Sequence, residues 1–195
     1  MTDASFHSLV AHPNTPSRVV RRIAASAELA GPDVLRFRYV LEADLQQVRV
    51  PPPAADAARA DNLWAHTCFE AFVSFALSPR YLELNFSTSG QWAAYGFESH
   101  RQHMAAVDLR APPRLTLRRS DERLDLQAEV AFSGALLSLG TAPDGVPGRL
   151  RIALSTVVED REGRLSYWAL CHPPGRPDFH HTESFALTLE LPATP

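Results

Sequence analysis

Residues 68–87 read CFEAFVSFALSPRYLELNFS and contain two apolar alternations separated by a polar break. In the first, apolar residues at 69, 71, 73 and 75 alternate with Glu70, Phe72 and Ser74. In the second, apolar residues at 82, 84 and 86 alternate with Tyr81, Glu83 and Asn85. Successive side chains of a strand point to opposite faces, so this period of two predicts two half-buried strands. The Ser-Pro-Arg break between them is typical of a turn.

The same alternation recurs along most of the chain. It predicts further strands at 35–41, 92–95, 115–117, 124–132, 150–158, 165–170 and 185–191, with polar turns at 120–122 and 160–163. Only Ala54–Ala60 and Phe132–Leu139 could be helical, and both are short. We read Pro51–Ala60 as an internal loop. The pattern predicts an all-β, antiparallel β-sandwich with few or no helices.

Length and composition indicate one globular domain. The 195 residues match the size of a single domain, here 1–195, and 45% of them are hydrophobic. The 19 basic and 22 acidic residues form no long run of one sign, so we expect no nucleic-acid partner and no anionic membrane surface. Every basic residue is arginine. Without lysine, a Schiff-base enzyme, a pyridoxal phosphate linkage and a P-loop are excluded.

The N-terminal residues predict neither export nor membrane insertion. No basic segment is followed by an apolar one, and nowhere do about 18 apolar residues run together. Cys68 and Cys171 match no metal-binding spacing. We expect a cytoplasmic protein with two reduced thiols, the alternative being a disulfide between them.

The face opposite the apolar one is the first candidate for a binding site. If 64–74 is extended, that face carries Trp64, His66, Cys68, Glu70 and Phe72. Near the C-terminus, Trp168 and His172 lie an even number of positions apart and would also share one face. Aromatic rings stack on the C–H faces of a sugar, while carboxylates and imidazoles pair with its hydroxyls. The alternative is that Trp64 and Trp168 are core residues of a two-sided sandwich.

Two further chemistries use residues of the same regions. Glu70 and Glu83 could form the carboxylate pair of a small glycoside hydrolase, provided that they lie about 5 to 9.5 Å apart across a cleft. Met104 with His103 could ligate haem, since Met104 is the only methionine other than Met1. Nucleophile-elbow, zinc-protease and dinucleotide-binding motifs are absent, and we expect no metal site and no catalytic residue.

The segment from Leu63 to Trp92 resembles one known family. Its motifs are 61–64 (DNLW), 68–73 (CFEAFV), 81–87 (YLELNFS) and 89–92 (SGQW), with 166–170 (SYWAL) near the end. They resemble the DOMON-like proteins related to family 9 carbohydrate-binding modules, in a bacterial subgroup. The resemblance covers Leu9 to Leu191 and implies a β-sandwich of jelly-roll type.

The resemblance also implies a ligand and its contacts. In the sugar-binding relatives, two tryptophans enclose a terminal sugar, and a glutamate six positions after the first binds hydroxyls. Trp64 and Glu70 match that spacing, Trp168 is the counterpart of the second tryptophan, and Asn85 resembles a polar contact on the next strand. The chain departs from the relatives at 65–67 (AHT), where they usually carry acidic residues.

We therefore expect a non-catalytic sugar-binding or amino-sugar-binding domain. Its contacts would be Trp64, Trp168, Glu70 and Asn85, with His66 and His172 at the rim. A saccharide or sugar nucleotide would be the ligand, no cofactor would be needed, and a cell-wall-precursor enzyme would be a partner by analogy. Haem-binding relatives imply the alternative of an electron-transfer domain.

Overall fold

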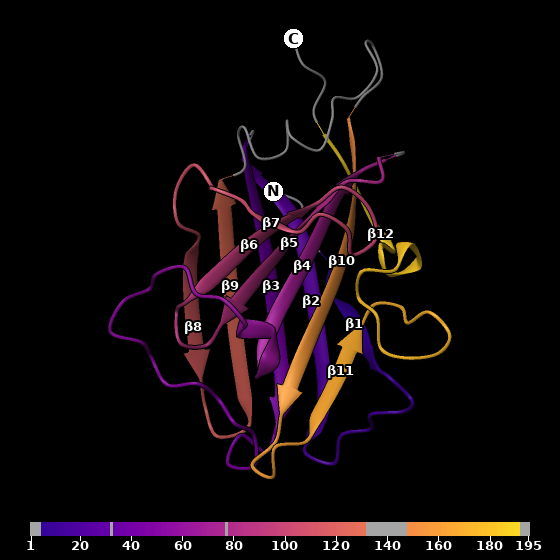
Figure 1. Cartoon of the computed structure of the whole chain (residues 1–195). Helices are drawn as coiled ribbons and strands as arrows, with labels where there is room; N and C mark the ends of the chain where they lie inside the picture. Colours follow the sequence, from indigo (N-terminus) through magenta and orange to yellow (C-terminus); the bar gives the residue numbers. More distant parts are fainter. Residues whose placement is uncertain (1–4, 32, 77, 132–147, 192–195) are drawn as a thin grey trace.

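A computed structural model describes residues 5–31, 33–76, 78–131 and 148–191 of the chain (Figure 1). Strands dominate these ranges, and the helices within them are short 3-10 turns, none with the length or apolar character needed to span a bilayer. The elements are β1 (His7–Ala11), β2 (Val20–Gly31), β3 (Val34–Ala43), η1 (Leu63–Ala65), β4 (Cys68–Phe75), β5 (Tyr81–Ser87), β6 (Trp92–Phe97), β7 (Ala105–Ala106), β8 (Arg114–Arg119), β9 (Arg123–Ala131), β10 (Arg149–Glu159), β11 (Leu165–Ala169), η3 (Thr182–Ser184) and β12 (Leu187–Glu190).

The strands form one curled antiparallel sheet that folds onto itself as a sandwich. Their order is β7-β6-β5-β4-β10-β11-β1-β2-β3-β9-β8, and β12 pairs with β10. We call β4–β7 with β10–β12 the β4 sheet, and β2, β3, β8 and β9 the β3 sheet. Strand β1 joins them, because His7–Leu9 pair with β2 whereas Val10–Ala11 pair with β11. Figure 1 shows the β4 sheet lying across the β3 sheet. The predicted all-β antiparallel sandwich is confirmed.

Alternating side chains fill the space between the two sheets. Phe37 and Tyr39 of β3 are buried against Phe86 and Phe69 of the β4 sheet, with ring centroids 5.9 and 5.2 Å apart. The Tyr39 hydroxyl donates to the backbone oxygen of Glu70 at 2.7 Å, which ties the sheets together. Burial of these apolar faces provides the main driving force for the fold.

A second apolar cluster lies on the other face of the β4 sheet. It comprises Phe72, Tyr81, Ala93, Tyr95, Phe97, Ala153, Val157, Ala169, Phe179 and Phe185. We call it the outer cluster. Because the loop after β11 supplies Phe179 and Phe185, this face is covered rather than left to solvent. The β4 sheet is therefore buried on both sides, and its two faces differ in what they pack against.

Two details differ from expectation. Residues 54–60 form no helix, and their run of prolines and small residues follows an irregular path. The other helical candidate, Phe132–Leu139, lies outside the described residues. Trp64 is not part of an extended segment, because the chain turns through η1 before β4 begins at Cys68. The strand parity assumed for Trp64 and His66 therefore does not apply.

Candidate ligand-binding site

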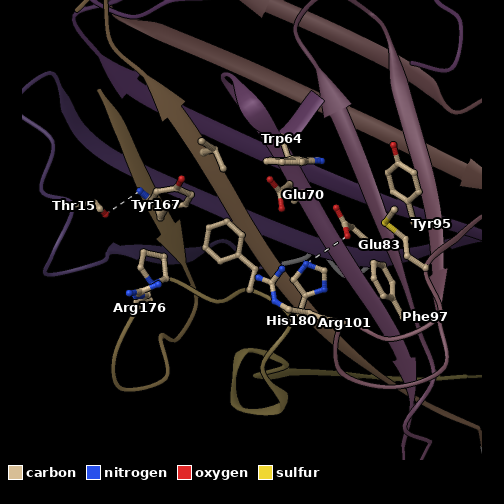
Figure 2. A pocket seen from close by; sticks show the side chains of 14 residues that line it. Thr15, Trp64, Glu70, Glu83, Tyr95, Phe97, Arg101, Tyr167, Arg176 and His180 are labelled. Atoms are coloured by element: carbon tan, nitrogen blue, oxygen red, sulfur yellow. Dashed lines mark hydrogen bonds and ion pairs between the residues drawn. The ribbon is translucent and has the colours of Figure 1, made fainter. Parts of the chain in front are cut away.

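A cavity of about 630 Å³ opens on the outer face of the β4 sheet (Figure 2). Strands β4, β5, β6, β10 and β11 contribute to its floor and walls, and the segments 97–104 and 176–180 complete its rim. It is lined by Thr15, Trp64, Glu70, Glu83, Tyr95, Phe97, Arg101, Met104, Val157, Tyr167, Arg176, Pro177, Phe179 and His180. A volume of this size accommodates a small organic ligand.

Two glutamates form the polar part of the floor. Glu70 lies opposite Asn85 in the β4–β5 register, and Glu83 lies opposite Phe72, so the glutamates are diagonal neighbours on one face. Oε1 of Glu83 accepts a hydrogen bond from Nδ2 of Asn85 at 2.7 Å. Oε1 of Glu70 is buried and accepts no hydrogen bond from any of the described residues. A buried carboxylate oxygen without a donor is unfavourable, so a ligand donor would stabilise it.

Burial dominates the electrostatics of this floor. It raises the pKa of Glu70 well above the usual glutamate range, and the charge of Glu83 raises that pKa further, while Arg101 opposes both effects. Burial also raises the pKa of Glu83, against the hydrogen bond from Asn85 and the charge of Arg101. The pair consequently retains a proton under conditions in which an exposed glutamate is ionised.

His180 and Tyr81 adjoin Glu83. The Tyr81 hydroxyl accepts the backbone N–H of Arg101 at 3.1 Å and shares a hydrogen bond with Nδ1 of His180 at 2.8 Å. Nε2 of His180 lies 3.7 Å from Oε2 of Glu83. Burial and the charge of Arg101 lower the pKa of His180 to about 3. The imidazole is therefore neutral, and its contact with Glu83 is not an ion pair.

Asp178 fixes the cationic side of the cavity. Its Oδ1 accepts from Nε and Nη2 of Arg101 at 3.2 and 2.9 Å, and its Oδ2 lies 2.8 Å from Nε2 of His100. Backbone N–H of His180 also donates to Oδ1 at 3.1 Å. The loop containing Asp178 is thereby joined to the loop that contains Arg101, and both hold their positions at the rim.

Aromatic rings form the walls. Trp64 is 51% exposed, and Figure 2 shows its ring at the wall of the cavity into which Glu70 and Glu83 are directed. Its position follows from η1, where Asn62 takes a left-handed backbone conformation (φ 60°) and its oxygen accepts the N–H of Ala65 at 3.1 Å. Tyr95 is fixed by the hydrogen bond from its hydroxyl to Asp61 at 2.6 Å.

The structure brings Trp64 and Glu70 to one cavity and places the other predicted contacts elsewhere. Asn85 is fully buried beside Glu83, on the same face of β5, and donates a hydrogen bond to it. Trp168 lies in the core between the sheets and donates to Oγ of Ser166 at 3.1 Å. The residue of β11 that reaches the cavity is its neighbour Tyr167.

The two rim histidines also lie away from the cavity lining. His66 contacts Oε2 of Glu159 through Nδ1 at 2.7 Å. His172 lies 2.9 Å from the backbone oxygen of Val10 through Nε2, and burial lowers its pKa. Both side chains therefore have structural partners in the fold.

The haem-ligand pair does not converge. Met104 is exposed and lines the cavity, but His103 lies in a separate hollow with Arg80, Gly96 and Glu98. Among the described residues, no group of three or more histidines, cysteines and acidic residues could hold a metal ion. Both cysteines are free, and Cys68 is buried with its Sγ 3.6 Å from Oδ1 of Asn85.

Sequence reasoning did not identify several lining residues as ligand contacts. The alternation of β5 could have indicated Glu83 as a contact, because Glu83 lies on the same face of the strand as Tyr81 and Asn85. Tyr167 required the register of β11, which the sequence does not give. Arg101, Phe179 and His180 come from irregular loops, where no periodicity indicates which side chain turns inward.

Comparison with known proteins places the fold. No protein-family model and no curated protein matches the chain. A candidate carbohydrate-binding protein from Bacteroides uniformis has a similar structure, with a TM-score of 0.68 and 14% identity over 96% of this chain and 86% of that one.

Two structures of a family 9 carbohydrate-binding module from Caldicellulosiruptor kristjanssonii are also similar. The complex with cellotriose matches with a TM-score of 0.50 and 8% identity over 88% of this chain and 75% of that one. The complex with glucose matches with a TM-score of 0.50 and 8% identity over 98% and 86%. At these identities the likeness establishes the shared β-sandwich fold.

Proposed function

We propose that this protein is a non-catalytic saccharide-binding domain whose site is the cavity on the outer face of the β4 sheet. One observation carries the proposal: the half-exposed ring of Trp64 and the unpartnered carboxyl of Glu70 line the same cavity. A sugar offers apolar C–H faces to the ring and hydroxyl donors to the carboxyl.

The comparisons support this ligand class. The proteins of similar fold are described as carbohydrate-binding, and two hold glucose or cellotriose. The spacing between Trp64 and Glu70 matches the motif of that family, and the finer kinship with DOMON-like proteins belongs to the same proposal. In place of a second tryptophan, Tyr167 and Phe179 are further aromatic residues of the cavity lining.

The two glutamates have a role in the proposed binding site. Glu70 and Glu83 are diagonal neighbours on adjacent strands, and both line the floor of the cavity. We assign them to ligand hydrogen bonding, with Asn85 positioning Glu83.

Tryptophan fluorescence and calorimetry test the proposal directly. The full chain would be titrated with glucose, glucosamine, cellobiose, N-acetylglucosamine, N-acetylmuramic acid and UDP-N-acetylglucosamine. Trp92 and Trp168 are buried in the core, so a ligand-dependent change in emission should come from Trp64. Saturable binding of at least one sugar is the expected result.

Variants locate the site. Trp64→Ala should weaken binding about tenfold, because the ligand loses contact area worth roughly 1.5 kcal/mol. Leu117→Ala is the matched control, since Leu117 is an exposed apolar side chain on β8. Equal affinity of wild type and Trp64→Ala would overturn the site assignment, and no heat or fluorescence change across the panel would overturn the function.

Haem binding through Met104 is the alternative that one spectrum decides. Met104 lines the cavity, so haemin added to the purified chain would show a shifted and sharpened Soret band if it were ligated there. A free-haemin spectrum, together with saturable sugar binding, is the result expected from our proposal.

A further inference from the structure

The charges around the cavity floor are unbalanced. Glu70 and Glu83 lie on the floor and Asp178 at the rim, whereas Arg101 is the cation that acts on both floor carboxyls. Arg101 is already engaged by Asp178 through two hydrogen bonds. His180 adds no positive charge, because its imidazole is neutral. Arg176 also lines the cavity, but it is not among the charges that shift the pKa of either glutamate. One carboxylate charge on the floor therefore has no cation of its own.

The titratable groups around Glu70 and Glu83 in the described residues supply no further positive charge to the floor. The groups are Tyr39 from β3, Cys68 from β4, Tyr81 from β5, Tyr95 from β6, Tyr167 from β11, and Arg101, Asp178 and His180 from the loops. The tyrosines and the thiol are held neutral by burial, which raises their pKa values. A proton shared by the two glutamates is what neutralises the floor.

The walls favour a cation in the same place. Trp64, Tyr95, Phe97, Tyr167 and Phe179 surround the space above the carboxyls. The negative face of an aromatic ring attracts an ammonium group, and the attraction is strongest where water is excluded. A cation inside these walls would be stabilised by the rings and by the carboxylates together.

We propose that the saccharide bound here carries a positively charged amino group, which binds at the floor between Glu70 and Glu83. This inference rests on the proposed function, since it concerns the same cavity. The ammonium group donates to the free Oε1 of Glu70 and to Glu83 and replaces the shared proton, which passes to the solvent. An N-acetylated or unsubstituted sugar lacks the charge to make this exchange.

Calorimetry with three sugars of one ring size tests the inference. D-glucosamine should bind about tenfold or more tightly than D-glucose and N-acetylglucosamine, because charged hydrogen bonds are stronger than neutral ones. Repeating the titration in two buffers of different ionisation enthalpy should show release of about one proton with glucosamine. The affinity for glucosamine should rise with pH as the pair gives up its proton, over a range that lies above the ordinary glutamate pKa of 4.5.

The outcomes separate the inference from the function on which it rests. If glucose binds as tightly as glucosamine, or if no proton is released, the amino group is not recognised and saccharide binding stands. If none of the sugars binds but ethanolamine does, the saccharide function fails. If nothing binds, both fail.

A charge-neutral variant tests whether the amino group of the ligand binds beside Glu83. Glu83→Gln should abolish the preference for glucosamine over glucose. Glu122→Gln, at an exposed side chain in the β8–β9 turn, should keep that preference. Circular dichroism would first show that each variant folds. A preference that persists in folded Glu83→Gln would place the amino group elsewhere, and the proton release of the wild type tests the inference without any variant.

Discussion

Glu70 is the residue at which stability and binding conflict most clearly. Its side chain is 3% exposed, and one carboxylate oxygen has no donor among the described residues. A hydrophobic or amide side chain would fit that position at lower cost in the free protein. Retaining an acid there is consistent with a group reserved for a ligand.

We expect Glu70→Gln to change how stability depends on pH. Burial and Glu83 raise the folded-state pKa of Glu70 above its unfolded value near 4.5, so the folded state keeps a proton that the unfolded chain releases. Wild-type stability should thus fall as pH rises through that window, by up to about 1.4 kcal/mol per pH unit for this group. Urea unfolding at several pH values from about 5 to about 8 would measure the slope, which should be shallower in the variant.

Glu122→Gln again provides the control, because an exposed glutamate should leave the slope unchanged. Parallel stability profiles of wild type and Glu70→Gln would show that the Glu70 carboxyl is ionised in the folded state.

Single residues also show how far the sequence determines the site. Glu70 and Glu83 could be placed on one face because they lie in strands with a clear period of two. Trp64 lines the cavity from the 3-10 turn η1, whereas the sequence interpretation had placed it in an extended strand. Arg101 and Phe179 could not be predicted, because tertiary contacts between loops decide their direction.

Among the elements, the hairpin between β10 and β11 confirms a turn that was predicted from local sequence. The predicted turn at 160–163 forms, with N–H of Gly163 donating to the oxygen of Asp160 at 3.0 Å. Gly163 takes a φ of +80°, and open space surrounds its Cα. A side chain there would meet no clash, so the conformation alone requires glycine.

Two glycine substitutions should therefore have opposite effects. Gly163→Ala should lower the free energy of unfolding by about 1 kcal/mol, because a left-handed backbone disfavours a Cβ atom. Gly31→Ala, at the end of β2, has an ordinary φ and only van der Waals contacts at 3.9 Å, so it should be neutral or stabilising by up to about 1 kcal/mol. Thermal unfolding of both variants measures the difference. A loss of stability in Gly31→Ala equal to that in Gly163→Ala would contradict the backbone explanation.

The strands themselves were predictable wherever one face is apolar. The alternation at 35–41 and 68–87 recurs as β3, β4 and β5, and the strands predicted at 115–117 and 124–132 form as β8 and β9, in which 115–117 pair with 126–128. Strand β2 was not predicted, because residues 23–27 are buried without interruption and show no period of two. Burial on both faces removes the polar positions by which a strand is recognised.

At the scale of the whole molecule, the short strand β1 connects the two sheets, and the sequence pattern did not predict it. Strand β1 pairs with β2 through residues 7–9 and with β11 through residues 10–11, so the two sheets share one edge. The outer cluster rests on β4, β5, β6, β10 and β11, whose other faces form the main core. Neither sheet can separate without exposing apolar surface of the other, and the site lies on the sheet that is buried on both sides.

We accordingly expect the chain to unfold in one cooperative transition, which also tests the predicted single domain. Urea unfolding would be followed by far-ultraviolet circular dichroism for the strands and by fluorescence of Trp64→Phe, in which Trp92 and Trp168 report on the core between the sheets. The two midpoints should coincide, because loss of the core removes the support of both sheets. An earlier transition seen by circular dichroism alone would mean that part of the β-structure, with or without the cavity, is a separate unit. The ligand would then order that part on binding instead of meeting a preformed floor.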